Sequence, residues 1–203
     1  LTLARRHLPE ALPRRFGTYE PLQYRLEDGH DGAFVDFVTG ADGAVYFKAN
    51  RPATDGSLAA GATYGGPIQS HGLTLLAEAL EDDRWLLALR RLFVDFAESV
   101  DAILATAEVV RGVHWSGRGL SYDGNTERTT YLAGRGNWAG LPPYPVWWTW
   151  FGEDYVPLVR DFLPPDQVEE HGPSLFHWRA DKPVGRDRLL ANRPAPEHDA
   201  RPR

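Results

Sequence analysis

The sequence predicts an α+β protein in which two or three helices pack on a mainly antiparallel sheet, all within a single domain. Three observations lead to this prediction. Apolar residues recur at helical spacing over 81–99, β-forming residues bounded by turn sequences fill 44–50 and 146–151, and hydrophobic residues make up 42% of a 203-residue chain. That length and composition suit one domain with a sizeable core.

The two ends of the chain differ from its middle. Residues 1–15 are interrupted by arginines and prolines, and we expect them to form an N-terminal arm. The segment 186–203 is rich in Pro and Arg and has no apolar periodicity, so we expect a flexible tail. The single α+β domain is therefore predicted over 16–185.

A short helix opens the domain. In HDGAFVDFVTG (30–40), Phe34, Phe37 and Val38 lie at positions i, i+3 and i+4. This spacing predicts a helix that ends at Gly40.

Two strands are predicted to follow the helix. Residues 41–43 form a turn, and the β-rich run 44–50 predicts the first strand. RPATDG (51–56) predicts a loop, and the second strand covers 57–66. The two strands are expected to pair as a hairpin around that loop.

The next segment combines an ambiguous run with the clearest helix. Residues 73–80 (LTLLAEAL) have a helical composition, but their length and the preceding turn residues favour a buried strand. Over 81–99, Asp82 or Asp83 is placed to cap a helix. Its apolar positions are Trp85, Leu89, Leu92, Phe93, Phe96 and Val100.

Residues 101–112 keep the phase of that helix and also suit a strand. A continuous helix from 83 to 111 would be about 43 Å long at 1.5 Å per residue, which is long for a domain of this size. We therefore expect a break near 99–101 and a strand across 102–110.

The last third begins with an irregular region. Residues 112–145 are rich in glycine, with a tight turn expected in YDGNTER (122–128) and a stiff, extended approach through GLPPYP (140–145). A helix is predicted over about 153–163, with Pro157 in its first turn. A final strand is predicted over 174–183.

The run VWWTWFGEDY (146–155) predicts a buried strand. Alternation sends aromatic side chains to both faces, as in a strand between two layers. A partner surface and a ligand-stacking platform remain alternative interpretations. One face holds Val146, Trp148 and Trp150, and the other holds Trp147, Thr149 and Phe151.

No residue pattern indicates a catalytic, cofactor or metal site. The chain has no cysteine, and it contains no HExxH, P-loop, dinucleotide fingerprint or GxSxG sequence. His171 and His177, with Glu169 and Glu170, have no recognised ligand spacing. We therefore expect neither an enzyme nor a cofactor, although a site that sequence does not reveal stays open.

The distribution of charge favours a basic partner. The net charge is −6, and residues 61–170 carry 8 basic and 16 acidic side chains. An acidic body repels nucleic acid and complements a basic protein, although a net negative charge also serves solubility alone. No run of 18 apolar residues and no signal-peptide run is present, so we expect a cytoplasmic protein that does not enter membranes.

The order of the elements carries a family resemblance. The features are RRFGTYEPLQ (14–23) before a hairpin, RWLLALRRLFVDFAES (84–99), DAILATAEV (101–109) and VWWTWFGEDYVPLV (146–159). Together they resemble the small α+β immunity proteins of bacterial polymorphic toxin systems. Within these, the chain is similar to the immunity protein 52 group and to related type VI immunity proteins, in which an aromatic W-x-x-[YF]-[FL]-G strand leads into a helix. Here that motif is Trp148, Phe151 and Gly152, or equally Trp147 with Trp150 and Phe151, just out of register.

This resemblance implies a protein that binds and neutralises a cognate toxin, such as a nuclease or another hydrolase, and has no catalytic residues. We expect the contact surface in the 112–137 loop and at the start of the last helix. An enzyme and a non-catalytic structural or interaction module are the alternative functions. The candidate partner-binding residues are Trp115, Asp123, Glu127, Glu153 and Asp154.

Overall fold

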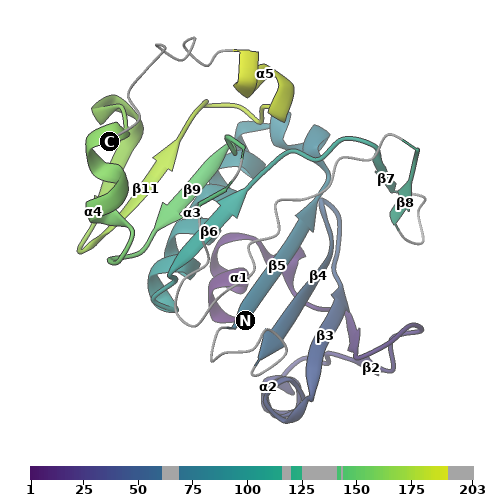
Figure 1. Ribbon diagram of the computed structural model, residues 1–203. Coiled ribbons are helices and arrows are strands. Elements are labelled where there is room, and N and C mark those ends of the chain that lie inside the picture. Colours follow the sequence, from purple (N-terminus) through teal and green to yellow (C-terminus); the bar gives the residue numbers. More distant parts are fainter. Residues whose placement is uncertain (61–68, 116–119, 125–140, 143, 192–203) are drawn as a thin grey trace.

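The computed structural model describes residues 1–60, 69–115, 120–124, 141–142 and 144–191, and confirms the α+β class. Its strands form two antiparallel sheets and a two-stranded ribbon (Figure 1). The first sheet has the order β2 (Tyr24–Arg25), β1 (Arg15–Gly17), β3 (Gly43–Lys48), β4 (Ala53–Ala60) and β5 (Ser70–Leu75). The second has the order β10 (Val168–His171), β11 (Ser174–Trp178), β9 (Trp148–Phe151) and β6 (Leu104–Ala107). The ribbon pairs β7 (Val113–Trp115) with β8 (Leu120–Tyr122).

Helices of very different length accompany the sheets. The α-helices are α1 (Thr2–His7), α2 (Asp31–Gly40), α3 (Asp83–Ser99), α4 (Val156–Val159) and α5 (Arg186–Ala191). Short 3₁₀ turns are η1 (Pro9–Ala11), η3 (Ala77–Glu81), η4 (Arg160–Phe162) and η5 (Pro165–Gln167).

The helix α3 joins the two sheets into one packed unit. Its Val94 and Ala97 pack with the tryptophans of the second sheet, while Leu92 packs with α1 and the first sheet. The predicted cap is confirmed, because the Asp82 carboxylate accepts a hydrogen bond from the Arg84 backbone N–H at 2.8 Å. A helix with apolar residues on two sides can bury both sides only between two layers.

The predicted hairpin is confirmed with a shorter turn. β3 pairs with β4 in antiparallel register from Gly43–Ala60 to Lys48–Asp55. The loop predicted over 51–56 is wrong in its second half, because the strand already begins at Ala53, which is fully buried against α3. The rest of the predicted second strand, beyond residue 60, lies outside the described residues.

The strand predicted over 73–80 and the break after α3 have different outcomes. β5 ends at Leu75 and the chain turns into η3, so the second half of that prediction is wrong. The break near 99–101 is confirmed: Asp101 has a φ of +48°, which no helix continues through, and β6 follows inside the predicted range.

The N-terminal segment, predicted as an arm, packs against α3. Leu8 is fully buried and Ala11 nearly so, in a cluster with Leu92 of α3. In the short sequence TLARRH, three basic residues fill the last turn of α1. Their positive charge stabilises the helix by interacting with the negative end of its dipole. Arg5 also forms an ion pair with Asp31 of α2.

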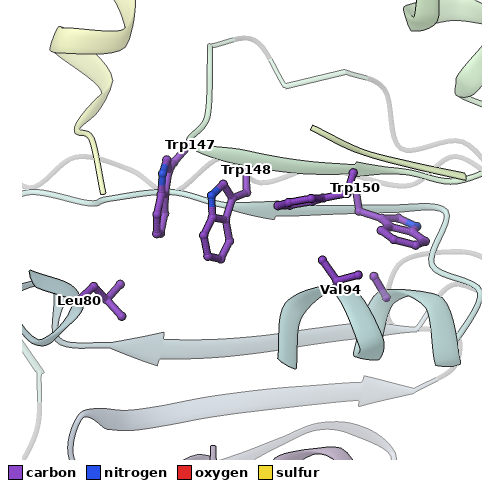
Figure 2. Close-up of a cluster of buried hydrophobic side chains, with 7 residues drawn as sticks. Leu80, Val94, Trp147, Trp148 and Trp150 are labelled. Atoms are coloured by element: carbon purple, nitrogen blue, oxygen red, sulfur yellow. The ribbon is translucent and has the colours of Figure 1, made fainter. Parts of the chain in front are cut away.

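The aromatic run forms the inner strand β9, as predicted. β9 is hydrogen-bonded to β11 on one side and β6 on the other, and all four of its residues are buried. Trp148 and Trp150 face α3, whereas Phe151 faces α4. Trp147 departs from the predicted alternation. It precedes the strand and stacks on Trp148 with ring centroids 3.9 Å apart, and both rings point toward Leu80 and Val94 (Figure 2).

Gly152 ends this strand at a point where the backbones nearly touch. A Cβ atom there would lie 2.6 Å from the carbonyl oxygen of Ala102 and 2.9 Å from that of Ile103. The Gly152 N–H also donates to the Ile103 oxygen at 2.9 Å. Only glycine allows this approach.

The helix predicted over 153–163 begins later than expected. Residues 152–155 form a hydrogen-bonded turn, in which the Tyr155 N–H donates to the Gly152 oxygen at 2.9 Å. This turn places Tyr155 in the core, so that α4 starts at Val156 and continues as η4. Glu153 and Asp154 therefore lie in the turn before α4 and not in its first turn.

The C-terminal strand is shorter than predicted and has an additional neighbour. β11 ends at Trp178, and two residues later the Ala180 carbonyl accepts a hydrogen bond from the Trp147 indole N–H at 2.8 Å. The edge strand β10 has the sequence VEEH, whose charges gave no apolar alternation. The first residues of the predicted tail form α5 with Leu189 buried, and 192–203 lie outside the described residues.

Candidate functional site

A groove of about 330 Å³ lies between the first half of α3 and the C-terminal end of β11. Three segments far apart in the sequence form it: α3, the start of β9, and the chain leaving β11. It is lined by Asp83, Leu86, Leu87, Arg90, Trp148, Trp178, Ala180 and Asp181.

Aromatic rings and a guanidinium group form one side of the groove. Trp178 is stacked with Phe176, with ring centroids 5.7 Å apart, and the Arg90 guanidinium lies 5.1 Å from both centroids. An Arg90 Nη2 atom also lies 2.7 Å from a Glu169 carboxylate oxygen of β10. Arg90 thus contacts both rings and is itself held by the ion pair with Glu169. These contacts restrict the movement of the partly buried Trp178.

Carboxylates form the rim of the groove. Asp83 lies in the first turn of α3, and Asp181 lies three residues beyond β11. The Lys182 ammonium forms an ion pair with Asp83 and donates to the Glu81 carbonyl at 3.1 Å. Within the part of the chain that the structure describes, Asp181 forms no ion pair, so one carboxylate of the rim is unneutralised.

This arrangement suits recognition of an exposed cation. The side chain of Asp83 is 87% exposed, so the carboxylate keeps its hydration and is not placed in the desolvated environment that tunes catalytic acids. Exposed carboxylates attract ammonium and guanidinium groups by charge, while the ring of Trp178 is partly buried and already has the Arg90 guanidinium 5.1 Å from its centroid.

The structure does not bring the predicted partner-binding residues together. Trp115 ends β7 and Asp123 follows β8, in a ribbon on the other side of the molecule from α4 (Figure 1). Glu127 lies outside the described residues. Glu153 and Asp154 are both exposed, as a contact surface requires, but they follow β9 at its far end from the groove.

The sequence interpretation missed the groove. Asp83 was considered only as a helix cap and Trp178 only as part of a strand, while Arg90 and Asp181 carry no local signal. The charge of the 81–83 acidic run was visible in the sequence, but nothing in it indicated that the chain after β11 would return beside α3.

The histidines considered as metal ligands lie on opposite faces of the second sheet. His171 faces α3, with its ring 5.3 Å from Trp150, whereas His177 faces the α4 side with Phe151. They cannot share an ion. Over the ranges that the structure describes, no group of three or more His, Cys, Asp or Glu is arranged to hold a metal ion.

His177 is a buried neutral base. It is 1% exposed, and no described residue forms a hydrogen bond with its Nε2 atom. Burial, together with the charge of Arg179, lowers the pKa of His177 to about 4. Its strand neighbours are Thr149 and Val168, neither of which ionises, so the side chain packs as part of the core.

Comparison with known proteins found no match: no family model, no curated protein and no solved structure resembles the chain closely enough. Among the described residues, no helix is long and apolar enough to cross a membrane.

Proposed function

We propose that this chain is an immunity protein that binds a toxin with a basic surface and neutralises it inside the producing cell. The observation that supports the proposal is the groove, which Asp83 and Asp181 line together with the partly buried Trp178. Aromatic residues next to charges are typical of protein interfaces. The negative charge of the central segment, already evident in the sequence, adds long-range attraction to a basic partner.

The position of the groove also supports binding. Its walls belong to α3 and β11, whose Val94, Ala97 and Phe176 are buried in one cluster, so its side chains are held before a partner arrives. A preorganised surface loses little conformational entropy on binding. A toxin whose active site binds a phosphate backbone would present the arginines and lysines that such a surface attracts.

Co-expression tests this function. Cells that express the toxin-like protein encoded beside this gene should grow when they also express the wild-type chain. Growth should be lost with the double variant Asp83→Lys/Asp181→Lys, because like charges then face the basic partner. The control Asp36→Lys reverses a carboxylate on α2, away from the groove, and should still protect.

Purified proteins give the second measurement. In calorimetry, the wild-type chain and the toxin should form a complex of fixed stoichiometry. In a kinetic binding measurement, the association rate should fall as the salt concentration rises. If the wild-type chain neither protects cells nor binds the neighbouring gene's product, the proposed function is wrong.

A further inference from the structure

The helical segment formed by α4 and η4 has one side in the core and one side in water. It lies at the margin of the molecule, on the face of the second sheet opposite α3 (Figure 1). Val156 and Val159 are buried in one cluster with Phe151 of β9. Leu158 and Phe162 are 49% and 85% exposed, so they point away from that cluster.

Leu158 and Phe162 form an apolar ridge, the outer ridge, on the side in water. They are four residues apart, so their side chains are neighbours on one face of the helical segment. Among the large apolar side chains that the structure describes, Phe162 is the most exposed, and no described residue makes a ring or cation–π contact with it. Single exposed apolar residues are common on protein surfaces, but neighbouring ones offer a contact area to a partner.

The spacing of the outer ridge indicates the shape of that partner. Side chains at positions i and i+4 form the ridge that one helix inserts into a groove on the surface of another helix. A helix that lies alongside η4 and carries an apolar stripe would cover both side chains of the ridge.

The charges around the outer ridge indicate the charge of that helix. Residues 153–163 carry three acidic side chains and one basic side chain, Arg160, which is paired with Glu170. The carboxylates of Asp154 and Asp161 are exposed, and no described residue forms an ion pair with them. A second copy of the chain or an anionic membrane would bring negative charges together here, whereas lysines and arginines would meet opposite charges.

From the ridge and its charges we infer that the outer side of α4 and η4 is a docking surface for a basic amphipathic helix of a partner protein. The apolar stripe of that helix covers Leu158 and Phe162, and its lysines or arginines face Asp154 and Asp161. The surface lies on the opposite face of the second sheet from the groove. The inference therefore goes beyond the proposed function and does not depend on it.

A lysine-rich peptide of about 18 residues, with one stripe of leucines at helical spacing, is the probe for this surface. The peptide is titrated into the ¹⁵N-labelled full chain, and the dissociation constant is read from the amide signals of residues 153–163. Phe162→Ser should weaken binding by about tenfold or more, the loss that truncating an aromatic anchor gives. Asp161→Asn should weaken it by about two- to fivefold, the range of one exposed ion pair.

Matched variants elsewhere on the surface separate docking from general attraction. Tyr19→Ser removes another exposed aromatic ring, between β1 and β2, and Asp36→Asn removes an exposed carboxylate of α2. Both variants should bind the peptide as the wild type does. A peptide with glutamate in place of every lysine should leave the signals of residues 153–163 unchanged. Circular dichroism of each variant checks that the fold is retained.

The peptide series can overturn the docking surface directly. The surface is wrong if the wild-type chain does not bind the lysine peptide through residues 153–163. It is also wrong if Phe162→Ser binds as tightly as Tyr19→Ser, or if Asp161→Asn binds as tightly as Asp36→Asn. Equal binding of the glutamate peptide would refute the argument from charge.

Two measurements on the wild-type chain and Phe162→Ser test the other occupants of the ridge. Sedimentation with phosphatidylserine vesicles tests a membrane, and analytical ultracentrifugation of the chain alone tests a second copy. We expect neither vesicle binding nor self-association. Either one, if Phe162→Ser abolishes it, would overturn the inference. A wild-type chain that gives no protection from the toxin overturns the proposed function and leaves this surface standing.

Discussion

Replacing Gly152 by alanine tests the closest backbone approach in the second sheet. The added methyl group would lie 2.6 Å from the Ala102 oxygen, 2.9 Å from the Ile103 oxygen and 3.1 Å from the Ile103 Cα. All three are backbone atoms, so no side chain can rotate away. The segment before β6 must move instead.

The expected cost follows from two terms. Moving the backbone by several tenths of an ångström in a packed region costs about 1–3 kcal/mol. The hydrogen bond from the Gly152 N–H to the Ile103 oxygen is weakened or lost, which costs about 0.5–1.5 kcal/mol. Gly152→Ala should therefore lower the free energy of unfolding by about 2–4 kcal/mol.

Urea unfolding followed by tryptophan fluorescence measures this loss, because the tryptophans of β9 lie in the affected sheet. Gly32→Ala is the matched control: Gly32 lies in α2, and an added Cβ there meets no atom within 4 Å. That variant should be unchanged or more stable by about 0.5–1 kcal/mol, since alanine favours a helix over glycine. If Gly152→Ala and Gly32→Ala unfold at the same urea concentration, the steric reasoning is refuted.

Two further predictions concern the core. Because the folded-state pKa of His177 is lowered from 6.5 to about 4, the unfolded chain takes up its proton first as the pH falls. Between pH 7 and pH 4, the free energy of unfolding of the wild type should therefore fall by about 2–3 kcal/mol more than that of His177→Gln. Urea unfolding at each pH measures this difference. Parallel pH profiles of the two proteins would contradict it. Leu8 is 0% exposed, so Leu8→Ala should cost about 2–5 kcal/mol in thermal or urea unfolding, and an unchanged midpoint would mean that the N-terminal segment does not stabilise the core.

Local signals accounted for the elements that the sequence predicted well. The helix α3 combines apolar residues at helical spacing with Asp82 as a cap, and both signals lie within 18 residues. The inner position of β9 followed from aromatic residues on both faces, which a strand with one solvated face would not carry. Such patterns depend on neighbours in the chain, so one sequence is enough to interpret them.

Edge and terminal elements lacked such signals. Among the strands that the structure describes, β10 pairs with β11 alone, and its Glu169 and Glu170 form ion pairs with Arg90 and Arg160. Its structure thus depends on partners 10 and 79 residues away. The start of α4 was misplaced for a related reason, because the burial of Tyr155, which depends on distant segments, accompanies a turn over residues 152–155.

The sequence by itself determined the α+β class, the central helix, the first hairpin, the buried aromatic strand and the acidic character of the body. The tertiary structure alone decided that the strands divide into two sheets, that α3 packs between them, and that Asp83, Trp178 and Asp181 meet in one groove. The physical reason is the separation in sequence between the residues that interact. Periodicity and capping act between residues a few positions apart, whereas the groove exists only because β11 pairs with β9 and brings residues 178–181 beside a helix nearly a hundred positions earlier.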